Sequence, residues 1–195
     1  MGQAVATAAY LCKKYDATPR EIGSDYIDEL QQMLLKDGIS IPNVYNHDKL
    51  DLALSATVTA DSFVKNGKPE NVINGKTRPT DGESYCWISE SGLPQSITLN
   101  LKSTKEISEI RITFDIPFDK YRYAYQPQPE LTNLVSGFYT EIMSDGKWIK
   151  IADVADNIQR LVTLKFDSIK ASKVRITVKS AINSDFAVIS EIRVY

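Results

Sequence analysis

The amino-acid sequence predicts a mainly β protein, an antiparallel β-sandwich of the jelly-roll type, preceded by a short two-helix N-terminal extension. Two observations predict the sandwich. Aliphatic and polar side chains alternate along several short segments after about residue 50, and turn-forming residues separate these segments. A third observation predicts the extension, because the earlier residues carry apolar side chains at three- and four-residue spacing. The chain is therefore expected to divide into a helical extension, residues 1–49, and a sandwich, residues 50–195.

The extension begins with an alanine-rich segment, residues 2–15, which contains no proline and has a high helix propensity. Thr18, Pro19 and Glu21 then have the spacing of a capping box with proline at the first helical position. Ser24 is placed to cap a second helix. The apolar stripe of that helix consists of Tyr26, Ile27, Leu30, Met33 and Leu34.

The sandwich is predicted from apolar residues with a period of two, which is the spacing of one face of a β-strand. These residues are Ile97, Leu99 and Leu101; Ile110, Ile112 and Phe114; Val162, Leu164 and Phe166; and Val174, Ile176 and Val178. Residues 144–147, Ser-Asp-Gly-Lys, form a predicted hairpin turn between residues 138–143 and 148–154. About eight short strands are expected. Their connections lack a helix-length apolar pattern, which favours antiparallel pairing.

Composition excludes several classes of function. The net charge is -2, so the chain has no strong electrostatic attraction to nucleic acid. No apolar run is long enough to span a bilayer, and no membrane partner is expected. His47 is the sole histidine, which argues against histidine-based metal clusters. Pairs of acidic residues show no sequence pattern typical of glycoside hydrolysis, so we expect no catalytic residues.

One group of motifs resembles a known family. Residues 71–75, Asn-Val-Ile-Asn-Gly, are followed by Trp87, and residues 191–195, Glu-Ile-Arg-Val-Tyr, form the last predicted strand. This combination resembles the discoidin domain, also called the coagulation factor 5/8 type C domain, over about residues 50–195. The fold of that family is galactose-binding-like, and its relatives include the family 32 carbohydrate-binding modules. The resemblance implies a binding module rather than an enzyme, and it favours a periplasmic or extracellular location.

A second resemblance concerns the N-terminus. Residues 1–9, Met-Gly-Gln-Ala-Val-Ala-Thr-Ala-Ala, resemble the last flavin-side helix of bacterial FAD-dependent oxidoreductases, although Ala6 stands where that family usually has glycine. Residues 28–35 resemble the helix that follows in the same family. The glycine-rich dinucleotide-binding turn is missing from these residues, so no FAD is expected in this chain. The resemblance implies the C-terminal piece of such an enzyme, with the catalytic part of the parent protein as a partner.

A candidate ligand-binding loop is the longest polar segment between predicted strands, which runs from Pro117 to Thr132 and follows Asp115 closely. Sugar-binding sites combine exposed aromatic rings with polar groups at their rim. The residues that offer this combination here are Tyr121, Arg122, Tyr123 and Tyr125, with Asp115 beside them. Alternatively, these tyrosines cover the edge of the sandwich or contact a partner.

The family resemblance also implies a structural Ca²⁺. Asn74 falls where the family usually has aspartate, Ser84 lies near the family's Thr or Ser before the tryptophan, and Glu191 matches the acidic residue of the last strand. Calcium takes several oxygen ligands, which these side chains and nearby carbonyl groups can supply. Two departures weaken the site: asparagine removes a charge, and the loop from Lys76 to Glu83 is longer than usual. Alternatively, Asn74 makes a turn hydrogen bond and Glu191 binds loop amides.

These observations together predict a non-catalytic module that binds carbohydrate and is appended to a parent enzyme. Two alternatives stay open. In the first, the chain is a structural C-terminal fragment of an FAD-dependent oxidoreductase with no binding activity of its own. In the second, it is an adhesion module that binds protein or lipid, for which Phe63 and Phe118 are the large apolar loop residues available.

Overall fold

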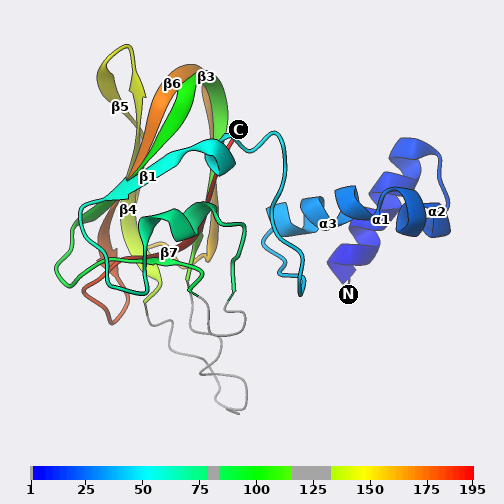
Figure 1. Cartoon of the computed structure of the whole chain (residues 1–195), viewed down its shortest axis with the longest axis horizontal. Coiled ribbons are helices and arrows are strands. Elements are labelled where there is room, and N and C mark those ends of the chain that lie inside the picture. The colour runs from blue at the N-terminus through cyan, green and yellow to red at the C-terminus, as the bar shows by residue number, and fades with distance from the viewer. Residues whose placement is uncertain (1, 79–83, 116–132) are drawn as a thin grey trace. The chain divides into compact units, whose positions relative to one another are not determined.

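The computed structural model describes residues 2–78, 84–115 and 133–195, and the chain divides into two units, Met1–Asp48 and Lys49–Tyr195 (Figure 1). The first unit contains the described helices α1 (Gly2–Tyr15), α2 (Pro19–Asp25) and α3 (Ile27–Lys36). None of the helices in the described residues is long and apolar enough to cross a membrane. The unit is held together by apolar contacts around Leu11, Ile22, Leu34 and Leu35, which are buried.

The capping box at the start of α2 is confirmed. The Thr18 side chain accepts a hydrogen bond from the Glu21 backbone N–H at 3.3 Å, and the Glu21 carboxylate accepts one from the Thr18 N–H at 2.7 Å. Ser24 does not cap the next helix, because its hydroxyl donates back to the Glu21 carbonyl. Tyr26 instead stands at the N-cap of α3, and its ring stacks on Tyr15 with centroids 4.2 Å apart. The predicted two-helix extension therefore contains three helices.

The second unit is an antiparallel β-structure, as the sequence predicts. Its described strands are β1 (Thr57–Ala60), β2 (Trp87–Ile88), β3 (Gln95–Phe114), β4 (Val135–Ser144), β5 (Lys147–Val154), β6 (Leu161–Ala181) and β7 (Val188–Val194). Hydrogen bonds connect them in the order β2-β7-β3-β6-β4-β5, and β1 pairs with β3 (Figure 1). Two short 3-10 helices, η1 (Leu52–Ser55) and η2 (Pro69–Ile73), accompany the strands.

Two long strands replace four of the short strands that the sequence predicts. In β3 the pairing register with β6 shifts between Asn100 and Lys105, and again between Ile107 and Glu109. Before these shifts β3 pairs with β1 and the second half of β6, and after them it pairs with β7 and the first half of β6. The two strands thus pass from one layer of the sandwich to the other. No glycine or proline interrupts residues 102–109 or 167–173, so nothing in either segment ends the strand.

The alternating aliphatic residues of the sequence form one buried cluster between the layers. It includes Ile97, Leu99, Ile110, Ile112, Phe114, Val174, Ile176 and Val178, all of them fully buried. Trp87 is also fully buried, and its indole N–H donates to the Ser62 carbonyl at 2.9 Å, so it packs in the core rather than offering a stacking surface. Because the interior is filled with side chains, ligands can reach only the loops and faces of the sandwich.

Candidate functional site

A groove of about 490 Å³ lies on the second unit, and it is lined by Lys65, Asn66, Lys68, Asn71 and Ser84. Its volume falls in the range of small-molecule sites in proteins. All five lining residues are polar, and none of them carries a carboxylate. The groove therefore offers amide, hydroxyl and ammonium groups to a ligand.

The wall of the groove is fixed to strand β2 by the main chain. The N–H of Val64 donates to the Ile88 carbonyl at 3.0 Å, and the N–H of Ile88 donates to the Gly67 carbonyl at 3.1 Å. A Cβ atom at Gly67 would stand 2.7 Å from the Ile88 nitrogen and 2.9 Å from its Cα atom. Glycine is therefore required at residue 67, since any side chain would separate the turn from the strand.

A second set of hydrogen bonds connects Asn71, Ser84 and Asn66, three of the residues that line the groove. The Asn71 side-chain amide donates to the Ser84 hydroxyl oxygen at 3.0 Å and to the Cys86 carbonyl at 2.9 Å. The Ser84 hydroxyl donates in turn to the Asn66 carbonyl. These bonds join η2 to the segment before β2, so the groove is built on fixed main-chain positions.

Tyr85, the residue after Ser84, belongs to a further group of polar contacts. The Tyr85 hydroxyl donates to the Asp115 carboxylate at 2.9 Å, and the Arg160 guanidinium donates to the Thr77 carbonyl at 2.7 Å. Burial raises the pKa of the Cys86 thiol to about 12, and the Asp115 charge acts in the same direction. Cys86 is therefore a protonated thiol at neutral pH and is not an activated nucleophile.

The predicted sugar-binding residues are placed only in part. Tyr121, Arg122, Tyr123 and Tyr125 lie outside the described residues. Asp115 is described, and it is 9% exposed and bonded to Tyr85. Its carboxylate therefore stands beneath the surface, where it positions neighbouring residues. The role of all five residues in binding stays a prediction.

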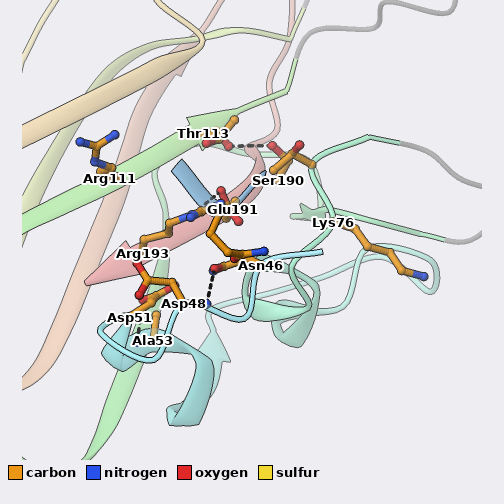
Figure 2. Close-up of polar contacts among 12 residues, drawn as sticks. Asn46, Asp48, Asp51, Ala53, Lys76, Arg111, Thr113, Ser190, Glu191 and Arg193 are labelled. Carbon is orange, nitrogen blue, oxygen red and sulfur yellow. Dashed lines mark hydrogen bonds and ion pairs between the residues drawn. The ribbon is translucent and has the colours of Figure 1, made fainter. Parts of the chain in front are cut away.

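The three predicted calcium ligands each have another partner. The Asn74 side-chain oxygen accepts a bond from the Lys76 N–H at 2.8 Å, which is the turn bond of the alternative interpretation. Ser84 lines the groove, and Glu191 lies on β7 in an ion pair with Arg193 (Figure 2). Across residues 2–78, 84–115 and 133–195, no three His, Cys, Asp or Glu side chains form a group that could hold a metal ion.

Glu191 and Arg193 form a buried ion pair in the sandwich. The two side chains are 5% and 2% exposed, and the carboxylate oxygen lies 2.9 Å from the Arg193 Nε atom. Burial raises the pKa of Glu191, although the Arg193 charge lowers it. The other oxygen of Glu191 has no hydrogen-bond partner among the described residues.

Sequence analysis missed the two lysines of the groove and the partner of Glu191. Lys65 and Lys68 surround a glycine in a loop, which gives no periodic signal. Arg193 stands two residues after Glu191 in a strand, so the two side chains share one face. This two-residue spacing is the feature of the sequence that could have identified the ion pair.

The comparisons with known proteins agree with this architecture. The module CpGH89CBM32-5 of Clostridium perfringens, solved with GalNAc-β-1,3-galactose, is similar over 74% of this chain and 99% of its own, with 23% identity and a TM-score of 0.58. The family 32 module of C. perfringens NanJ, solved with galactose, has 20% identity and a TM-score of 0.59 over 74% of this chain and 97% of its own.

A third similar structure is chitosan-binding module 1 of a chitosanase/glucanase from Paenibacillus sp. IK-5, with 18% identity and a TM-score of 0.60 over 74% of this chain and 98% of its own. The TM-scores of these three structures show a shared fold. No curated protein sequence matches the chain. The model of the F5/8 type C domain matches residues 56–192, which is most of the chain and nearly all of the sandwich. The chain therefore belongs to the F5/8 type C domain family.

Proposed function

We propose that the sandwich is a non-catalytic module that binds carbohydrate. The observation that carries this proposal is the polar groove held on a rigid β-scaffold, because sugars are recognised by amide and hydroxyl groups that bond their own hydroxyls. The similar structures support the ligand class, since they were solved with galactose or with a galactose-containing disaccharide. Binding rather than catalysis is favoured because none of the five described lining residues has a carboxylate to act as an acid or a base.

The module is proposed to act for a parent enzyme by keeping it close to a glycan. Such tethering raises the effective concentration of substrate without new chemistry. From the sequence resemblance of residues 1–9 and 28–35, we propose that this parent is an FAD-dependent oxidoreductase whose C-terminal helices are α1 to α3. A glycan array probed with this chain tests the binding function, and retention on no glycan would contradict it.

Tyr123→Ala is expected to weaken glycan retention about five- to tenfold, because an aromatic contact contributes on the order of 1 kcal/mol. The measurement is affinity electrophoresis on the glycan that the array identifies. The melting temperature should not change. Tyr10→Ala is the matched control, since Tyr10 lies on α1 and is 55% exposed. Equal glycan retention by Tyr123→Ala and Tyr10→Ala would show that the tyrosines of residues 121–125 are not part of the binding site.

We also propose that Glu191, Asn74 and Ser84 hold a structural Ca²⁺. The ion would stabilise the last strand, which carries Glu191, against the segments that carry Asn74 and Ser84. The unpartnered oxygen of Glu191 favours this proposal, because a hard cation binds carboxylate oxygen. Millimolar calcium is expected to raise the melting temperature of EDTA-treated protein by a few degrees, by mass action on the folded state. Glu191→Gln should abolish the shift, whereas Glu106→Gln, an exposed residue on β3, should preserve it. A melting temperature that calcium leaves unchanged would argue for a metal-free loop.

A further inference from the structure

We propose that the groove selects an acidic sugar and that Lys65 and Lys68 bind its anionic group, a carboxylate or a sulfate ester. This inference rests on the proposed function, and it adds the chemical class of the ligand. Both lysines line one groove, and both are exposed. Within the described part of the chain, neither lysine has a carboxylate partner, although Lys14, Lys150 and Lys179 each form an ion pair.

The positions of the two lysines are fixed by the main chain around them. The N–H of Gly67 donates to the Val64 carbonyl at 2.8 Å, which closes the turn that carries Lys65. Lys68 is the N-cap residue of η2, and its carbonyl accepts the N–H of Asn71 at 3.2 Å. Both side chains therefore start from rigid positions on the same wall, and a bound anion would require little ordering of the backbone.

The other lining residues suit the neutral part of the same sugar. Both amide hydrogens of Asn71 are donated to Ser84 and Cys86, so its carbonyl oxygen is the atom that can accept a bond from a sugar hydroxyl. Asn66 supplies a further side-chain amide at the rim. Two cations and several neutral hydrogen-bonding groups, with no carboxylate among the described lining residues, are complementary to a sugar that carries both hydroxyl groups and a negative charge.

The test compares three probes on the full chain by isothermal titration: a neutral galactose oligosaccharide, an oligogalacturonate and a sulfated galactan oligosaccharide. We expect at least one acidic probe to bind about tenfold more tightly than the neutral probe in low salt. The advantage should shrink at 0.5 M salt, because salt screens exposed charges. The two acidic probes distinguish carboxylate from sulfate recognition.

Lys65→Met and Lys68→Met should each lower acidic-sugar affinity about threefold, and the double variant should bind acidic and neutral probes equally. Binding of the neutral probe should fall by less than binding of the acidic probes in these variants. Lys102→Met, at an exposed residue of β3, is the matched control and should keep the acidic preference.

Equal affinity of the unmodified chain for all probes would overturn the inference while leaving carbohydrate binding intact. An acidic preference that survives in the double variant would overturn the assignment of the lysines. Failure to bind any oligosaccharide, together with binding to vesicles that contain phosphatidylserine, would overturn the proposed function as well. In that case the exposed side chains of Phe63 and Val64, beside Lys65, would contact a membrane surface.

Discussion

Arg193→Met is expected to lower the free energy of unfolding by about 3–5 kcal/mol at pH 8, because it leaves the buried Glu191 carboxylate without its counter-charge. Methionine keeps most of the apolar stem of arginine, so the change removes charge rather than volume. Glu191 and Arg193 are 5% and 2% exposed, and water cannot readily replace the lost partner. This is the most direct test of what the pair contributes to the fold.

The loss of stability in Arg193→Met should depend on pH. Burial raises the pKa of Glu191 in the folded protein, and removal of Arg193 takes away the charge that opposes this rise. Between the ordinary glutamate pKa, about 4.3, and its raised value, the folded variant binds a proton that the unfolded chain has lost. Stability therefore falls as pH increases through this window. The variant should be closer to the unmodified protein at pH 5 than at pH 8.

Urea unfolding of the variants at the two pH values measures this effect. Glu191→Gln combined with Arg193→Met should recover part of the stability, because no unpaired charge is then buried. Arg175→Met is the control for a partly exposed pair with Glu141, and we expect a loss of about 1 kcal/mol or less. A similar loss of stability in Arg193→Met and Arg175→Met, with no dependence on pH, would show that Glu191 is solvated or has another partner.

The strand pattern around this pair shows where prediction from sequence succeeds and where it stops. A segment that reads Glu-Ile-Arg-Val suggests a strand with one buried and one exposed face. The strand is present, but every residue of β7 is buried. Residues far away in the chain contribute to this burial, since the Asp51 carboxylate accepts a bond from the Val194 N–H at 3.0 Å. The same carboxylate oxygen accepts a bond from the Ala53 N–H, also at 3.0 Å (Figure 2). Burial that depends on contacts with distant residues cannot be recognised in the sequence of the strand itself.

The same distinction applies to the other elements. The period-two aliphatics identify the sandwich correctly, because alternate burial is a property of each strand alone. The extents of β3 and β6 were not predicted, since continuation through residues 102–109 depends on a partner strand that is distant in sequence. The capping box of Thr18 is local and was predicted, whereas the break between α2 and α3 at Tyr26 was not.

The groove itself could not be predicted from sequence for a related reason. Lys65 and Lys68 become part of one wall only because the turn at Gly67 lies against Ile88, which is distant in the chain. Asn71 becomes part of the groove through its bonds to Ser84 and Cys86. The residue types were visible in the sequence, but their grouping is a product of the sandwich.

Gly67→Ala is expected to abolish measurable glycan binding and to lower the free energy of unfolding by about 1–3 kcal/mol. The added methyl group would stand 2.5 Å from the Ile88 Cβ atom and closer than 3 Å to two of its main-chain atoms. Main-chain atoms of a paired strand cannot rotate away as a flexible side chain does, so the turn must move from β2. This movement breaks the bonds between Gly67, Val64 and Ile88 that hold both lysines in place.

Urea unfolding and glycan titration on the same variant separate the two consequences. Gly23→Ala is the matched control, because a Cβ atom there meets nothing within 4 Å, and alanine within a helix should cost no stability. Binding should persist in a folded Gly67→Ala protein only if the ligand lies elsewhere on the sandwich, for example on the tyrosines of residues 121–125. A folded variant with unchanged affinity would therefore remove the groove from the binding site, whereas a folded variant without affinity would place the ligand against the turn at Gly67.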